Sequence, residues 1–171
     1  MITFGSGSLS GYFVEDVCTM GDPEDAANQL SLENFQFGLV TEQTVFSGNF
    51  DAIIGLAYPS MAEKGLTPFF DEIMEEEILK DNLFAFFMSM NPAEEESDLT
   101  LGYYDKNHYT GKMNWHDVRD KLFFSLSLED IKLNGESLGI CNDEKTKCLV
   151  TPDSGTSAST MPSWALDKFT S

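Results

Sequence analysis

The sequence predicts a mainly β fold, and two observations carry that prediction. Apolar and polar residues alternate between turns rich in Gly, Asp and Asn over residues 1–50, and the alternation returns over residues 115–133. A period of two is typical of strands that bury one face. Helical signals occupy two short segments, around residues 67–78 and 162–169, so few helices are expected.

In the first half of the chain, the clearest alternation falls at residues 12–17 and 35–39, which are predicted to form antiparallel strands. Residues 50–59 then form a compact apolar run closed by Gly and Pro. Such a run fits a strand that is buried on both faces.

A helix is predicted next. Thr67 can cap it, Pro68 suits its first position, and acidic residues follow near the positive end of the helix. Its apolar face is formed by Phe69, Phe70, Ile73, Met74 and Ile78.

The remaining elements follow in order. Residues 83–88 and 99–103 are predicted to form a hairpin around a charged turn. The clearest later strand is residues 123–128, and a final helix is expected to begin at Pro162.

The composition excludes two classes of function. The 171 residues carry 29 Asp and Glu against 10 Lys and Arg, a net charge of −19. That charge repels phosphate backbones, so no nucleic-acid partner is expected. No stretch approaches the roughly 18 uncharged apolar residues of a membrane span, so no span is expected in this chain.

Three cysteines cannot all pair within one chain. Cys141 and Cys148 bracket a short polar loop that suits a local disulfide, which leaves Cys18 over; three reduced cysteines are the alternative. Neither His108 nor His116 stands at ligand spacing from the cysteines, so no metal site and no cofactor are predicted.

The most informative stretch is residues 148–157, where an acid follows a β run and a tight turn comes at once. Gly155 allows the backbone to approach the Asp153 carboxylate closely and to adopt φ values that other residues avoid. Ser154 and Thr156 offer hydroxyls that can orient the acid. An ordinary Asp-Ser-Gly turn is the alternative for this stretch taken alone.

Three blocks of the sequence resemble one protein family. Residues 153–157 resemble the second catalytic Asp-Thr/Ser-Gly-Thr/Ser motif of the pepsin-like aspartic proteases. Residues 4–11 resemble the tip and return strand of that family's flap, and residues 50–59 resemble the segment behind its first active-site loop. The order and spacing agree over essentially the whole chain, and the residues after the acid are somewhat similar to the plasmepsin branch.

The resemblance implies a pepsin-like bilobal fold, of which this chain is a part. Residues 1–107 would be the C-terminal part of the N-terminal lobe, with the flap at 3–11 and the inter-lobe strands. Residues 108–171 would be the N-terminal part of the C-terminal lobe, with the catalytic Asp motif.

The mechanism that the resemblance implies pairs two aspartates, one from each lobe, around a single water. Two carboxylates about 3 Å apart cannot both ionise, so they share a proton, and aspartic proteases are the standard example of such a dyad. Asp153 would be one member, and the other Asp-Thr-Gly is expected upstream of Phe4. The 171 residues alone are therefore expected to be inactive.

The resemblance also implies residues that bind the substrate. The flap would offer backbone hydrogen bonds to an extended peptide, and Phe4 stands where the family usually has Tyr. Phe50 and Ile53 would wall the S1 pocket, and Phe123 would face the primed side, with ordinary core packing as the alternative for these three. In the flap, the backbone hydrogen bonds to the peptide would come from Gly5, Ser6 and Gly7.

A peptide or protein substrate and a monomeric full-length protein are expected, in a secreted or an acidic vacuolar or lysosome-like compartment. Thr151 and Pro152 stand where the family normally has an aliphatic pair, and Pro152 lacks a strand N–H. The alternative from another class is therefore a non-catalytic, protease-like module that binds a peptide or a partner. A subtilisin-like triad fits poorly because its Asp and Ser motifs would overlap here.

Overall fold

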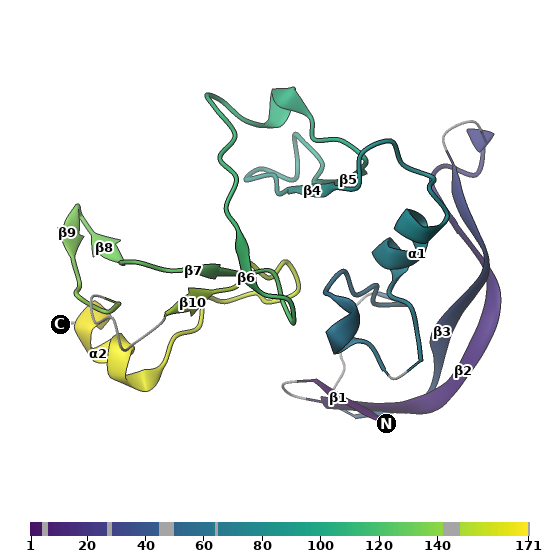
Figure 1. Ribbon diagram of the computed structural model, residues 1–171, viewed down its shortest axis with the longest axis horizontal. Coiled ribbons are helices and arrows are strands. Elements are labelled where there is room, and N and C mark those ends of the chain that lie inside the picture. The colour runs from purple at the N-terminus through teal and green to yellow at the C-terminus, as the bar shows by residue number, and fades with distance from the viewer. Residues whose placement is uncertain (5–6, 27–28, 45–49, 64, 142–147, 171) are drawn as a thin grey trace. The chain divides into compact units, whose positions relative to one another are not determined.

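The computed structural model describes residues 1–4, 7–26, 29–44, 50–63, 65–141 and 148–170, and it is built mainly from strands, as predicted (Figure 1). The chain divides into two compact units, Met1–Lys112 and Met113–Ser171. Each unit has its own strands and its own helix, and each is described below by itself. Among the described residues, no helix has both the length and the apolar character needed to cross a membrane.

An antiparallel sheet of three strands forms the first part of the first unit. Its order is β1 (Ile2–Phe4), β2 (Gly7–Met20) and β3 (Leu30–Thr44). Tyr12 pairs with Leu39 in the β2–β3 register, so the strands predicted around 12–17 and 35–39 are confirmed as parts of two long strands. Figure 1 shows these two strands as a long curved ribbon.

The long ribbon is interrupted by two register shifts, one between Ser10 and Gly11 and one between Asp16 and Cys18. At the first shift, a Cβ atom on Gly11 would lie 2.0 Å from the carbonyl oxygen of Leu39. Only glycine allows this close approach of the two backbones. Gly11 therefore fixes where the ladder shifts.

Helix α1 (Phe69–Glu75) is formed where the sequence predicts a helix, but its ends differ. Pro68 is the N-cap residue and Thr67 makes no capping contribution, because no side chain caps the helix. The helix ends before Ile78, since Glu77 has a φ of 53° and breaks the helical path. Met74 lies beside the core as a partly buried residue.

The core of the first unit lies between α1 and the first residues of β3. It consists of Leu32 on β3 with Phe69, Phe70 and Ile73 on α1, and Leu32 and Ile73 are fully buried. Phe69 meets Phe35 edge to face at 5.8 Å, a favourable geometry for aromatic rings. Figure 1 shows α1 on the concave side of the curved ribbon of β2 and β3, where its apolar face packs against β3.

The prediction of a strand at residues 50–59 is wrong. Residues 50–58 form no strand, and the short helix η2 (Pro59–Met61) follows them. A strand buried on both faces needs a paired strand on each side, and in the described part of the chain no strand pairs with this run. Phe50, Ile53 and Ile54 are consequently exposed.

The predicted hairpin is confirmed as β4 (Phe84–Phe87) and β5 (Asp98–Leu101), which pair antiparallel. Helix η3 (Lys106–His108) follows, with the Asp105 side chain accepting a hydrogen bond from the amide of Asn107 at its N-terminus. The His108 ring stacks on Phe87 of β4, with ring centroids 3.9 Å apart, which joins η3 to the hairpin.

The second unit holds a small antiparallel sheet in the order β10 (Leu149–Val150), β7 (Ser125–Ser127) and β6 (Val118–Asp120). The strand predicted over residues 123–128 is therefore shorter than expected, because residues 121–124 form the turn between β6 and β7. Aromatic residues at 123 and 124 carry strand propensity, but the turn position overrides it.

Two further elements complete the second unit. The hairpin of β8 (Lys132–Leu133) and β9 (Glu136–Ser137) turns through Asn134 and Gly135, whose φ angles are 51° and 89°. Asn-Gly is the favoured sequence for such a two-residue turn. Helix α2 (Ser163–Thr170) confirms the helix predicted from Pro162 onward, and its Ala165 is buried.

Candidate active site

Asp153 lies just beyond the end of β10, at the point where the chain leaves the small sheet. The two residues of β10 pair with β7, Leu149 with Ser127 and Val150 with Leu126. One residue further, the Thr151 and Ser125 hydroxyl oxygens are 2.9 Å apart and share a hydrogen bond. The pairing of β10 with β7 therefore positions the segment that leads to Asp153.

The Asp153 side chain is held by the turn that follows it. The amide of Gly155 donates to Oδ1 over 2.9 Å, and the hydroxyl of Thr156 donates to Oδ2 over 2.5 Å. The amide of Thr156 also donates to the backbone carbonyl of Asp153 over 3.3 Å. Each carboxylate oxygen thus accepts a hydrogen bond, while the residue itself stays exposed to solvent.

These two donors change the electrostatics of the carboxyl group. The Thr156 hydroxyl, and after it the Gly155 amide, hold the pKa of Asp153 below its ordinary value, and a small desolvation works in the opposite direction. Donors that point at a carboxylate stabilise its charged form. Asp153 is therefore an oriented, exposed anion that can accept a proton or a hydrogen bond from a bound water.

Gly155 contributes in one of the two ways that the sequence predicts. A Cβ atom at this position would lie 3.3 Å from Oδ1 of Asp153, a tight contact, so the close backbone approach holds. The expected unusual φ does not occur, because Gly155 is absent from the residues with positive φ. Ser154 lies in the same turn and is exposed.

Pro152 does not interrupt the sheet. Strand β10 ends at Val150, and among the described residues it pairs only with β7, as an edge strand. Proline is tolerated at such a position because no ladder hydrogen bond is lost there. The missing N–H of Pro152 therefore leaves the path to Asp153 intact.

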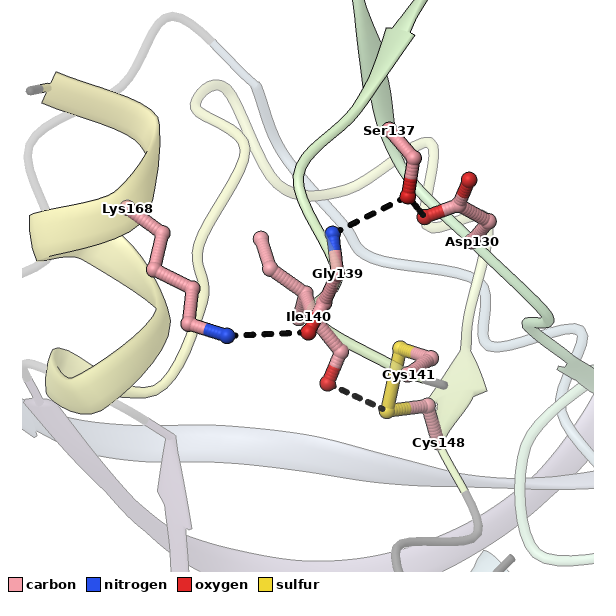
Figure 2. The surroundings of a disulfide bond; sticks show 7 residues. All are labelled: Asp130, Ser137, Gly139, Ile140, Cys141, Cys148 and Lys168. Atoms are coloured by element: carbon pink, nitrogen blue, oxygen red, sulfur yellow. Dashed lines mark hydrogen bonds between the residues drawn. A yellow bond between two sulfur atoms is a disulfide. The ribbon is translucent and has the colours of Figure 1, made fainter. Parts of the chain in front are cut away.

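A disulfide joins Cys141 and Cys148, whose Cα atoms are 5.7 Å apart, and Cys148 directly precedes β10 (Figure 2). The pairing proposed from the short polar loop is thus present in the structure, and Cys18 is a free, partly buried cysteine on β2. The loop residues 142–147 lie outside the described residues. The disulfide fixes the start of β10, the strand that leads to the candidate acid.

Figure 2 also shows how the segment before the disulfide is held. The Lys168 ammonium of α2 donates to the carbonyl oxygen of Gly139 over 2.9 Å, and the amide of Gly139 donates to the Ser137 hydroxyl. Ser137 in turn donates to Asp130 over 2.9 Å. Helix α2 and the β8–β9 hairpin therefore both anchor the segment that carries Cys141.

The predicted flap residues lie in the first unit. Phe4 ends β1 and pairs with Gly7, the first residue of β2, in an antiparallel hairpin. Gly5 and Ser6 lie outside the described residues. The backbone of this hairpin is extended up to Phe4 and from Gly7 onward.

The three predicted pocket residues are exposed. Phe50 is 52% exposed and Ile53 is 56% exposed in the first unit, and Phe123 is 41% exposed in the second. None of the three is part of a buried core in the described structure. The structure groups Asp153 with Ser154, Gly155 and Thr156, and it places the flap and pocket candidates Phe4, Gly7, Phe50 and Ile53 in the other unit.

Sequence reasoning missed one pair of residues beside the acid, Ser125 and Thr151. Both are small hydroxyl residues 26 positions apart, and no local motif links them. Only the β7–β10 register brings them together. Among the described residues, no group of three or more His, Cys, Asp or Glu side chains is placed to hold a metal ion.

Comparison with known proteins gives consistent matches. Residues 1–171 match the family model described as eukaryotic aspartyl protease. The chain is 35% identical to cathepsin D of Chionodraco hamatus over 166 residues, which cover 95% of this chain and 39% of that protein. It is 33% identical to pepsin II-1 of Oryctolagus cuniculus over 170 residues, covering 99% of the chain and 42% of the relative.

A third relative, cathepsin E of Cavia porcellus, is 34% identical over 164 residues, which cover 94% of this chain and 39% of that protein. The chain thus spans about two fifths of the length of the curated relatives it matches.

Proposed function

Because the chain belongs to the eukaryotic aspartyl protease family, we propose that the protein carrying it is an aspartic endopeptidase in which Asp153 is one of two catalytic carboxylates. The observation that carries this proposal is the Asp153 turn. Its carboxylate is exposed, accepts a hydrogen bond on each oxygen and has a lowered pKa. A carboxylate so oriented is suited to binding and activating a water.

In the proposed reaction, one carboxylate of the dyad accepts a proton from the bound water as the water oxygen attacks the peptide carbonyl carbon. The other carboxyl group, which holds the shared proton, donates it to the carbonyl oxygen. The tetrahedral intermediate then breaks its C–N bond: the carboxyl group that took the proton from the water gives it to the leaving nitrogen, and a hydroxyl of the intermediate returns a proton to the other carboxylate. The products are a carboxylic acid and an amine, and no cofactor is needed.

The second carboxylate is proposed to come from the part of the relatives' length that this chain does not span. Residues 1–107 would then belong to one lobe and residues 108–171 to the other. For this reason the 171 residues by themselves are proposed to lack peptidase activity.

Substrate binding is proposed for two groups of residues. The flap, at residues 3–11, would add hydrogen bonds to an extended peptide, as an added strand does. The exposed apolar side chains at Phe50, Ile53 and Phe123 would contact substrate side chains, which their exposure permits. A monomeric protein that acts on peptides in a secreted or an acidic vacuolar or lysosome-like compartment completes the proposal.

The test is cleavage of a protein substrate by the purified full-length protein across pH 2–8, with and without an inhibitor specific for aspartic proteases. Inhibitors of serine, cysteine and metallopeptidases serve as controls. The proposal expects cleavage at acid pH that the aspartic protease inhibitor alone abolishes. Cleavage that survives this inhibitor, or a folded full-length protein that binds peptides without cutting them, would overturn it in favour of another activity or a binding module.

A further inference from the structure

Ser125 stands out among the polar residues of the described structure. It is only 4% exposed, and among the described residues it is the one polar residue that is buried. Its hydroxyl is 2.9 Å from the hydroxyl of Thr151. A buried hydroxyl costs free energy unless it is hydrogen-bonded, so the partner on Thr151 matters to the fold at this point.

The position of this hydrogen bond along the chain links it to the acid. Strand β10 pairs with β7 through Leu149 and Val150. Thr151 comes next, and Pro152 after it has no N–H to donate and a fixed φ near −65°. Among the hydrogen bonds of the described residues, the Ser125–Thr151 bond is therefore the one that joins the chain to β7 closest to Asp153.

Within the described parts of the chain, the Asp153 carboxylate itself bonds inside its own turn, to Gly155 and Thr156. These local bonds set the orientation of the carboxylate inside the turn but not the position of the turn on the sheet. That position depends on the anchor at Thr151 and on the stiff Pro152 link.

We propose that Ser125 is a positioning residue for the candidate catalytic Asp153, acting through the hydroxyl of Thr151. The proposal rests on the function proposed above. Ser125 does not touch the substrate or the reacting atoms; it holds the segment that carries Asp153 at a fixed distance from β7. A displacement of about 1 Å at a reacting group can lower a rate by around a hundredfold.

The two partners are not equivalent, which sharpens the test. Thr151→Val removes the bond and leaves the buried Ser125 hydroxyl without its partner, whereas Ser125→Ala leaves a hydroxyl on the exposed Thr151, which water can satisfy. Thr151→Val is therefore expected to destabilise the fold more than Ser125→Ala. Both are expected to lower kcat alike, because both release the anchor.

The experiment uses the full-length protein with Ser125→Ala, Thr151→Val, the double variant and Thr151→Ser, with peptide cleavage and thermal unfolding measured for each. Ser125→Ala and Thr151→Val are expected to lower kcat on the order of tenfold to a hundredfold with KM nearly unchanged. The double variant should fall no further, and Thr151→Ser should keep the wild-type kcat because it keeps the hydroxyl. Ser127→Ala, which alters the next hydroxyl along β7, bonded to Arg119, is the matched control.

Failure of this inference is separable from failure of the proposed function. If Asp153→Asn retains full cleavage, the proposed function is wrong. If Asp153→Asn is inactive while folded Ser125→Ala and Thr151→Val keep the wild-type kcat, the positioning role is wrong and the function stands. A loss of kcat in Thr151→Ser equal to that in Thr151→Val would also overturn the positioning role. Should Thr151→Val fail to fold, Ser125→Ala still tests the anchor, because it leaves no buried hydroxyl without a partner.

Discussion

The amide of Gly155 donates a hydrogen bond to Oδ1 of Asp153 over 2.9 Å, two residues back along the chain. With the Thr156 hydroxyl on Oδ2, this bond makes the acid and its two donors one local turn. The turn is set by four consecutive residues and so needs no distant part of the chain to orient the carboxylate.

Replacing Thr156 by Val is expected to raise the pKa of Asp153, because the Thr156 hydroxyl is the main cause of its lowering. The acid limb of the kcat/KM profile of the full-length protein should then move to higher pH. Thr156→Ser keeps the hydroxyl and is the matched control. Coincident acid limbs for Thr156→Val and the wild type would contradict the prediction.

The same lowered pKa fixes the sign of its effect on stability. A carboxyl group whose pKa is lower in the folded state contributes stability above its unfolded pKa, about 3.9, and loses that stability as the pH falls through the folded pKa. Thr156→Val should therefore cost stability at neutral pH and little in strong acid. Urea unfolding at pH 7 and pH 2 measures the difference.

The acidic residues of helix α1 make the stability of the fold depend on pH in the opposite direction. Burial and then the charge of Glu75 raise the pKa values of Asp71 and Glu72, so the folded state binds protons more readily and stability falls as the pH rises through their titration. Glu75→Gln should relieve this repulsion, and also remove an anion near the negative helix end. At pH 7 the gain should be a few tenths of a kcal/mol, because these side chains are only partly buried and water still screens their charges.

The measurement for α1 is the free energy of unfolding at pH 7 and pH 3, with Glu94→Gln in the exposed charged turn as the control. Glu75→Gln should raise stability at pH 7 and leave it nearly unchanged at pH 3. An equal change at both pH values would show that charge repulsion is not the cause.

A further prediction concerns the hydrophobic core, in which Ile73 of α1 is fully buried. Ile73→Ala should lower the free energy of unfolding by about 2–5 kcal/mol, because it removes packed methyl groups and leaves a cavity. Ile78→Ala, just beyond the helix at an exposed residue, should cost about 1 kcal/mol or less. Similar losses for both variants would contradict the position of the core.

Loss of the disulfide between Cys141 and Cys148 is expected to cost about 2–3 kcal/mol, because the bridge closes a short loop. The variant is Cys141→Ser with Cys148→Ser, followed by chemical unfolding. Peptide mass analysis after alkylation without reductant should find Cys18 modified and the other two protected. Alkylation of Cys141 and Cys148 in the native protein would refute the pairing.

Much of the fold follows from local sequence. The alternation around Tyr12 and Leu39 identifies two strands. Phe69 and Ile73 mark the buried face of α1. The residues after Asp153 are typical of a turn, and this turn orients the Asp153 carboxylate. In each case the signal lies within a few residues of the element, so periodicity and turn chemistry are enough to find it.

The sequence-based predictions fail where the structure of a segment depends on residues far away in the chain. The run at 50–59 has the composition of a buried strand, but its state depends on partner strands that the run itself does not encode. Phe123 has strand propensity, yet it lies in the turn between β6 and β7. Ser125 meets Thr151 only through the register of two strands, which no local pattern specifies.

The most direct test of the central claim is the activity of Asp153→Asn in the full-length protein at acid pH, beside Asp167→Asn on the exposed side of α2. A dyad with one ionisable member cannot cycle its shared proton. The account predicts that Asp153→Asn folds and abolishes cleavage, while Asp167→Asn cleaves like the wild type. Cleavage by folded Asp153→Asn at the wild-type rate would show that Asp153 is not a catalytic residue.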